Sequence, residues 1–129
     1  MLKHLLKMYL SFLVVPVKKG VFMGLIKISE LAKTTDTSIH TVRNYISERL
    51  INCCDHTKCG YGLFNNEAIQ RLKLIRAFRL AGLMLADIKP LINAMNNKSN
   101  FNHIIEGLET KIDTNIVNLT TVKSMIKQL

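Results

Sequence analysis

The order of hydrophobic and polar residues predicts two short helices between residues 28 and 50. The first has an apolar face at positions i, i+3 and i+4, formed by Ile28, Leu31 and Ala32, with Ser29 as its capping residue. The second, over residues 38–50, begins at a capping Ser38 and turns four apolar residues inward: Ile39, Val42, Ile46 and Leu50. Between them, residues 34–37 are poor helix formers, which predict a turn.

The outward face of the second helix carries hydrogen-bonding side chains: His40, Thr41, Arg43, Asn44 and Ser47. Such side chains can contact base edges or phosphates when a helix lies in the major groove of DNA. A short hairpin is expected directly afterwards, over residues 52–64 (NCCDHTKCGYGLF). The pattern therefore predicts a winged helix-turn-helix that reads DNA.

Two further helices are predicted after the hairpin. One covers residues 67–81, is capped by Asn65 or Asn66 and ends at Gly82. The next covers about residues 85–94, and its inward residues are Ile88, Leu91 and Ile92. The polar residues 96–100 then link it to the last part of the chain.

From residue 101 onward, apolar residues repeat with alternating steps of four and three, a heptad pattern that we call the seam. Its members are Phe101, Ile105, Leu108, Ile112, Asn115, Leu119, Val122, Ile126 and Leu129. This pattern predicts a coiled-coil helix, which at 1.5 Å per residue would reach roughly 43 Å. The alternative is a single amphipathic helix that packs on the preceding helix-turn-helix part of the same chain. Asn115 is either a register-setting polar residue or a simple break in the seam.

The run A-x(3)-D-T-S-x-x-T-V-R-x-Y-x-x-x-R-L-I, over residues 32–51, resembles the DNA-binding head of the MerR family of transcriptional regulators. GYGLF at residues 60–64 stands where that family has its wing, and residues 68–92 look like the following pair of helices. The resemblance implies a mostly α-helical fold: a winged helix-turn-helix over residues 25–95 and a dimerisation helix over 100–129.

Two departures from the family's pattern refine the resemblance. Asp36 stands where the family usually has a turn glycine, and Asp tolerates left-handed backbone angles better than most residues. Gly62 follows Tyr61 where the family's wing usually has Arg, which looks more like the MerD branch, small co-regulators of mercury-resistance operons. The family's mercury sensors have cysteines around the dimerisation helix, whereas this sequence has none after Cys59. The resemblance thus implies a co-regulator without an inducer site, which lowers expression from the mercury-resistance operator and promoter.

The resemblance also implies residue roles and partners. Thr41 would approach base edges, Arg43 would bind a phosphate or a base, Tyr45 would contact phosphate through its hydroxyl, and Lys58 and Tyr61 would hold the flanking backbone. The dimer contact would involve Ile105, Leu108, Ile112, Asn115, Leu119, Val122 and Ile126. The expected partners are double-stranded operator DNA, a second copy of the chain through an antiparallel helix pair, and a full-length MerR-type regulator at the same promoter.

The charge agrees with a polyanionic partner. The chain has 18 Lys and Arg against 9 Asp and Glu, a net charge of +9. Residues 1–22 hold four lysines and no acid, so the rest carries 14 basic and 9 acidic residues, or +5. A moderately basic domain is compatible with nucleic-acid binding but does not by itself indicate it.

The N-terminal segment, residues 1–22, is interpreted as upstream sequence included by a misplaced start, with Met23 as the alternative first residue. Its longest uncharged run is residues 8–17, which is far below the roughly 20 residues that a membrane span needs. No A-x-A-like cleavage site follows it. We expect a cytoplasmic protein without membrane attachment.

The cysteines of the predicted hairpin offer a different chemistry. Cys53, Cys54, His56 and Cys59 are ligand types suited to zinc or mercury, but they crowd one loop and neighbouring cysteines on a strand point apart. We therefore expect no metal and no other cofactor. Three cysteines without a credible export signal suit a reducing cytoplasm.

No catalytic motif is present, so we expect no enzymatic activity. Two other functions compete with a DNA-binding co-regulator. One is a compact MerR-type activator that senses metal through the hairpin cysteines. The other is a protein-interaction adaptor that uses the helix-turn-helix only as a scaffold.

Overall fold

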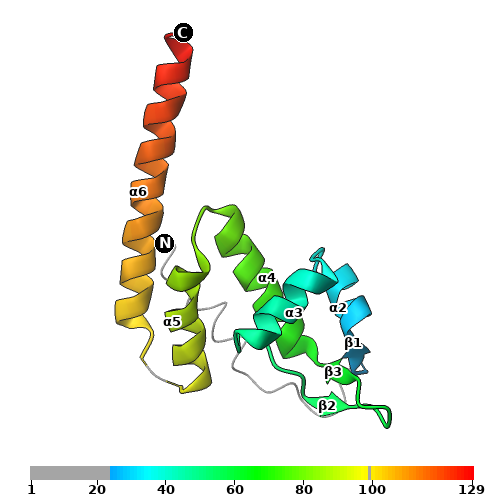
Figure 1. Ribbon diagram of the computed structural model, residues 1–129. Helices are drawn as coiled ribbons and strands as arrows, with labels where there is room; N and C mark the ends of the chain where they lie inside the picture. The colour runs from blue at the N-terminus through cyan, green and yellow to red at the C-terminus, as the bar shows by residue number, and fades with distance from the viewer. Residues whose placement is uncertain (1–23, 99) are drawn as a thin grey trace. The chain divides into compact units, whose positions relative to one another are not determined.

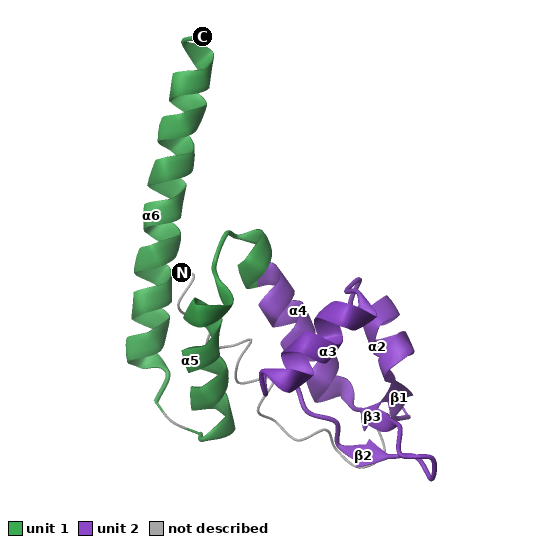
Figure 2. Cartoon of the chain, in the orientation of Figure 1, with its two compact units in different colours: residues 1–10, 78–129 green, residues 11–77 purple. Residues whose placement is uncertain are grey.

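A computed structural model describes residues 24–98 and 100–129 (Figure 1). The interpretation of residues 1–22 as misplaced upstream sequence lies outside the described residues. The described residues form two compact units, 24–77 and 78–129, and the division between them falls inside one helix (Figure 2). The fold is mostly α-helical with a small sheet, as the sequence predicts.

The described elements follow one another in this order: β1 (Ile26–Lys27), α2 (Ile28–Thr34), α3 (Ile39–Ser47), β2 (Asp55–His56), β3 (Gly62–Phe64), α4 (Asn66–Leu80), α5 (Leu85–Asn96) and α6 (Asn102–Lys127). The three strands form an antiparallel sheet in the order β1-β3-β2. The predicted hairpin is therefore confirmed as β2 and β3, and β1 adds a strand that the sequence pattern did not reveal.

In the first unit, α2 packs against α3 and against strands β1 and β3, and the two helices form the helix-turn-helix. Leu31 and Val42 are fully buried between these elements, as their helical spacing predicts. Two expectations were wrong. Ser29 is the second residue of α2 and caps nothing, because the helix starts directly after β1 with Lys27 at its N-cap. Ile39 is 37% exposed, since it is the first residue of α3 and lies at the margin of its buried face.

The turn between α2 and α3 depends on Asp36, which has a left-handed φ of 51°. This conformation is strained for a residue with a Cβ atom. Arg76 of α4 compensates: one guanidinium nitrogen donates to the Asp36 carbonyl oxygen, and Nη2 lies 3.1 Å from Asp36 Oδ2. A residue 40 positions away thus holds the turn of the helix-turn-helix in place.

The ends of α4 and α3 share one hydrogen-bond pattern, in which the chain turns through a left-handed residue. At the end of α4, Gly82 has a φ of 90°, and the Leu83 N–H donates to the Phe78 carbonyl at 3.0 Å. At the end of α3, Arg49 has a φ of 60°, and the Leu50 N–H donates to the Tyr45 carbonyl at 2.9 Å. Glycine adopts this conformation without strain, whereas arginine does not.

Replacing Arg49 with Gly should therefore stabilise the fold. We expect the free energy of unfolding to rise by about 1 kcal/mol, because the left-handed backbone is then unstrained. Denaturant unfolding at 0.5 M salt and fixed protein concentration would measure this, since salt screens the favourable interaction of the Arg49 charge with the C-terminus of α3. Arg49→Ala is the control: it removes the charge but keeps the strain. Equal stabilisation by both variants would contradict the backbone explanation.

The second unit consists of the last residues of α4 and the whole of α5 and α6. Its core contains the expected inward residues of α5 together with the first part of α6, and the fully buried members are Leu83, Ile88, Leu91, Ile92 and Ile105. Lys111 Nζ lies 2.6 Å from Asp87 Oδ1 and joins α6 to the start of α5. This hydrogen bond, together with one from the Met84 N–H at 2.9 Å, holds the pKa of Asp87 below its usual value.

In the first unit, α4 begins after Asn65, whose Oδ1 accepts a hydrogen bond from the Ala68 N–H at 3.3 Å.

The seam of α6 has two parts. Ile105 and Leu108 are buried inside the unit, where α6 contacts α5, while Ile112 and Asn115 are half-buried. The later members are exposed: Leu119, Val122, Ile126 and Leu129. The heptad pattern thus continues beyond the region that the chain itself covers. No helix in the described part of the chain is long and apolar enough to cross a membrane.

Candidate nucleic-acid interface

The outward face of α3 is exposed to solvent, as the sequence predicts. His40, Arg43, Asn44 and Ser47 all lie on it, and Asn44 Nδ2 approaches His40 Nε2 to 3.5 Å. Within the described residues, no hydrogen bond or ion pair engages the Arg43 guanidinium, whose five N–H donors are thus available to a ligand. Val42, the neighbouring residue, is fully buried and anchors the helix. The face therefore presents donors and acceptors from a fixed helix.

The first turn of α3 is stabilised by Ser38. Its Oγ accepts a hydrogen bond from the Thr41 N–H at 3.0 Å, which confirms the predicted cap, and its hydroxyl donates to Thr41 Oγ1 at 2.8 Å. Thr41 is half-buried, and its own hydroxyl hydrogen is left to donate elsewhere. Tyr45 is also half-buried, which places part of its ring against the fold.

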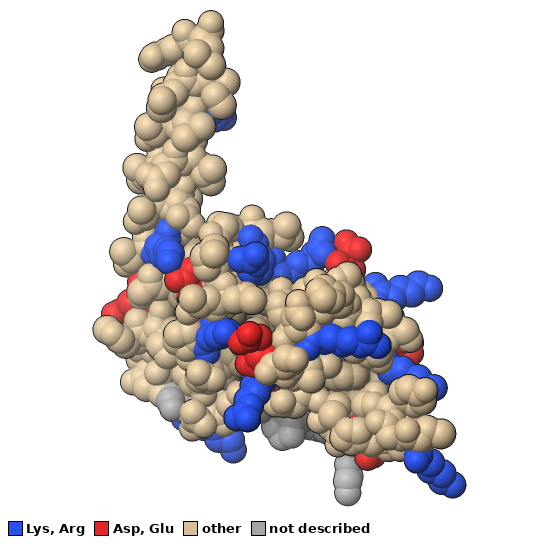
Figure 3. All heavy atoms as spheres, viewed as in Figure 1, with Lys and Arg blue, Asp and Glu red and all other residues tan. Residues whose placement is uncertain are grey.

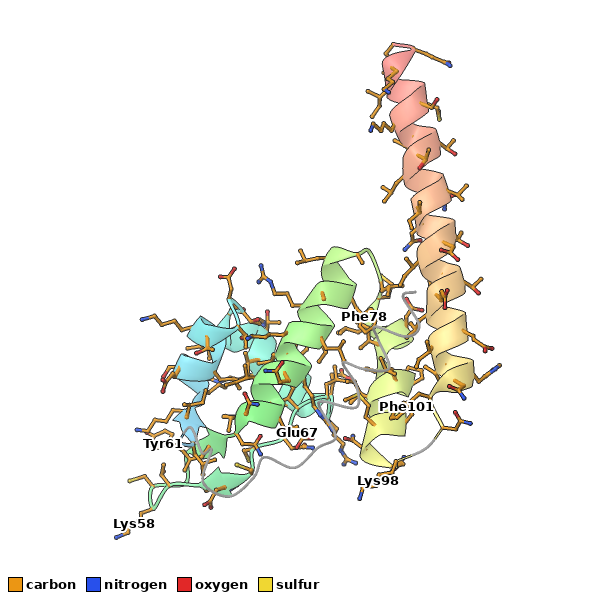
Figure 4. All side chains as sticks on the ribbon, turned by 180° about the vertical axis from the view of Figure 1, so that it is seen from behind. Lys58, Tyr61, Glu67, Phe78, Lys98 and Phe101 are labelled. Atoms are coloured by element: carbon orange, nitrogen blue, oxygen red, sulfur yellow. The ribbon has the colours of Figure 1, made fainter. Side chains whose placement is uncertain are left out.

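The hairpin formed by β2, β3 and the turn between them is the wing. Its turn is closed by Thr57, whose N–H donates to the Tyr61 carbonyl at 2.8 Å and whose carbonyl accepts from the Gly60 N–H at 2.9 Å. Lys58 lies at the end of the wing and points into solvent (Figure 4). Tyr61 is 65% exposed, unusually open for an aromatic side chain, and Lys27 Nζ lies 5.8 Å from the centre of its ring.

Basic residues outnumber acidic ones in the unit that carries α3 and the wing. Over residues 24–77 there are eight Lys and Arg against five Asp and Glu, a net charge of +3. On the face that Figure 3 shows, lysine and arginine side chains are spread over the surface, with fewer aspartate and glutamate side chains among them. The unit is thus moderately basic, which favours an anionic partner.

Arg71 is a cation of this unit that the sequence pattern did not single out. Its side chain is 9% exposed, Nη2 lies 3.0 Å from Glu67 Oε1, and Nη1 donates to the Leu50 carbonyl at 3.5 Å. Nε has no partner in the described part of the protein. Because Leu50 follows α3, Arg71 helps to position the end of that helix. Its contact spans 21 residues of sequence, so no local pattern could indicate it.

The wing cysteines do not gather into a metal centre. Cys53 Sγ lies 3.4 Å from His56 Nε2, but no three His, Cys, Asp or Glu side chains among the described residues are placed to hold an ion. Desolvation raises the pKa of the Cys54 thiol, which makes it a poorer ligand at neutral pH. All three cysteines are free thiols.

Gly62 and Cys53 fit together across the wing. A Cβ atom at residue 62 would lie 3.3 Å from Cys53 Cβ, closer than ordinary van der Waals contact. The absence of a side chain at Gly62 therefore makes room for Cys53. This contact explains physically why the larger Arg of the family's usual wing is not accommodated here without a shift of Cys53.

Residues 26–95 match the family model described as MerR HTH family regulatory protein, which covers more than half of the chain. The chain is 36% identical over 74 residues to the HTH-type transcriptional regulator MerD of Acinetobacter calcoaceticus, a match covering 57% of this chain and 61% of the relative. It is 40% identical over 55 residues to MerD of Pseudomonas fluorescens, covering 43% of this chain and all of that sequence. The chain thus spans about three fifths of the length of the Acinetobacter relative.

The fold is similar to the crystal structure of HiNmlR, a MerR family regulator lacking the sensor domain, bound to promoter DNA. The TM-score is 0.66 at 19% identity, and the match covers 81% of this chain and 80% of that one. At this identity the likeness concerns the fold alone.

Proposed function

The chain belongs to the MerR family of helix-turn-helix DNA-binding transcriptional regulators, and from that membership we propose that it is a MerD-like co-regulator, which binds a mercury-resistance operator and lowers transcription. The similarity to MerD over residues of the head supports this assignment. The Gly62 that follows Tyr61 in the wing supports it as well. Family membership sets aside the alternative of an adaptor that does not bind DNA.

One observation carries the proposal: α3 and the wing belong to the same compact unit, and both present unburied donors and cations. Arg43 supplies the donors of α3, while Lys58 and Tyr61 supply those of the wing. A recognition helix in the major groove with a wing on the flanking backbone uses these groups in their expected roles, and Thr41 and Tyr45 complete the contact.

We further propose that two copies pair through the exposed part of α6. A helix that leaves Leu119, Val122 and Ile126 between 51% and 68% exposed has an apolar stripe that needs a partner. A second copy in antiparallel orientation would cover these residues on both helices. The resulting dimer would have two-fold symmetry, which suits binding to a palindromic operator. A full-length MerR-type regulator at the same promoter is the proposed functional partner.

Binding to DNA tests the proposal directly. The protein should protect a mercury-type operator fragment from nuclease digestion, and excess random-sequence duplex should not displace it. A reporter driven by the same promoter should lose activity when the protein is supplied beside a full-length MerR-type regulator. Binding to the operator fragment no tighter than to random duplex would contradict the operator assignment.

A metal-responsive activator is the second candidate, favoured by the 3.4 Å approach of Cys53 Sγ to His56 Nε2. Two ligands do not complete a typical metal site. We therefore expect the triple variant Cys53→Ser, Cys54→Ser, Cys59→Ser to bind the operator within about twofold of the wild-type affinity, with or without zinc or mercury, because a twofold change is only roughly 0.4 kcal/mol. Titration of metal during a binding assay would measure this. A large metal effect in wild type that the triple variant lacks would favour the activator.

A further inference from the structure

Tyr61 is held firmly at its backbone while its ring remains in solvent. Its carbonyl accepts from the Thr57 N–H at 2.8 Å, and its N–H donates to Thr57 Oγ1 at 3.1 Å. These two bonds close the wing on either side of the same residue. An aromatic side chain that is 65% exposed on a fixed backbone contributes little to the core, so its position favours contact with another molecule.

Lys27 reaches the same place from a different part of the chain. It is paired with Leu63 in the sheet, and Tyr61 stands two residues before Leu63, so the two side chains emerge on the same face. The Lys27 ammonium lies 5.8 Å from the ring centre of Tyr61, a distance at which the ring attracts a cation. Lys27 is also the N-cap residue of α2, which ties its backbone to both the sheet and the helix-turn-helix.

This pair has the composition of an anion-binding site. An ammonium group has three N–H donors, and the ring can occupy only one side of it, which leaves the others for an oxyanion. The tyrosine hydroxyl is a further donor on the same face of the sheet. Lys58 lies three residues before Tyr61 on the wing and adds a second positive charge nearby.

We propose that Lys27 and Tyr61 bind one backbone phosphate of DNA at the base of the wing, with Lys27 as the charged donor and the Tyr61 ring holding its ammonium in place. This inference rests on the proposed function and adds Lys27 to its contact residues. It assigns the contact to the phosphate backbone, so the effect of Lys27 is independent of base sequence.

The test compares Lys27→Ala with wild type on a mercury-type operator fragment and on a random-sequence duplex, from 50 to 200 mM salt. One lost phosphate contact reduces the magnitude of the salt slope by about 0.9. For each protein, the affinity at 50 mM salt is divided by the affinity at 200 mM salt. This ratio should be about 3.5-fold smaller for Lys27→Ala than for wild type, on both duplexes. Lys27→Arg should keep the wild-type slope, and Lys73→Ala, which removes an exposed lysine from α4, is the matched control.

A double-mutant cycle separates a shared phosphate from two independent contacts. Tyr61→Phe removes the hydroxyl but keeps the ring under Lys27, and it should weaken binding less in the Lys27→Ala background than in wild type. Unfolding midpoints of all variants should remain within a few degrees of wild type, which separates binding from folding.

A wild-type slope in Lys27→Ala, or equal changes in Lys27→Ala and Lys73→Ala, would overturn this inference. Either result would leave the proposed function standing if wild type still binds the operator specifically. A wild type that fails to bind the operator would instead overturn the proposed function itself.

Discussion

Replacing Leu119 with Asp should convert the proposed dimer into monomers. Leu119 is 68% exposed and is the first residue of the exposed part of the seam, where a second copy of α6 would cover it. A carboxylate at this position would be buried against apolar neighbours without a partner, at a cost of roughly 3 kcal/mol or more. Dimerisation should therefore weaken by at least about 100-fold, since each 1.4 kcal/mol is a factor of ten.

Sedimentation at micromolar concentration would measure this change, and operator affinity should fall with it, because each monomer reads only half a site. Val117→Asp is a matched control. Val117 is 62% exposed, but it stands on the side of α6 opposite Leu119 and the seam, so its replacement should leave the dimer intact. A wild-type monomer at these concentrations, or equal dissociation by both variants, would end the proposal of a dimer through the seam.

The sequence predicts those parts of the fold that depend on residues close together in the chain. Ser38 caps α3, Gly82 turns the chain at the end of α4, and the buried residues of α5 follow a helical repeat. Each depends on a cap, a left-handed residue or a period of 3.6, which act within a few residues. Asp36, predicted to accept a left-handed turn, does so at a φ of 51°.

The errors at the start of the head arise from β1. A two-residue strand has no periodicity, so the sequence pattern places the helix cap at Ser29 and gives no sign that Lys27 belongs to a strand. The position of Lys27 over Tyr61 follows from strand pairing between residues 26–27 and 63–64. The sequence alone offers no local signal for that pairing, so Lys27 was missed.

Contacts between segments far apart in the chain could not be predicted from the sequence pattern either. Arg76 and Asp36 are 40 residues apart, and Arg71 and Leu50 are 21 residues apart. The seam illustrates another limit, because a heptad repeat does not specify which molecule covers it. The fold buries Ile105 within the chain and leaves Ile126 exposed, although both occupy the same stripe.

The strongest test of the recognition helix is Arg43→Ala. Arg43 is exposed on α3, while the adjacent Val42 is fully buried, so truncating the arginine should spare the fold. If Arg43 binds a phosphate, the variant should bind all DNA sequences more weakly and lose about one from the magnitude of the salt slope. If Arg43 instead makes two hydrogen bonds to a guanine, the variant should lose about 1–3 kcal/mol of binding free energy, and only on the operator.

A salt series on operator and random-sequence duplexes distinguishes these two contacts, with unfolding midpoints as the control for folding. Ser47→Ala is a useful comparison, because Ser47 is exposed at the last position of α3 but has no charge to lose. Its salt slope should match that of wild type, whatever small hydrogen-bonding effect it has. If Arg43→Ala keeps both the affinity and the salt slope of wild type, then α3 does not contact DNA through this residue. The outward face of the helix would then need another donor to fill the role assigned to Arg43.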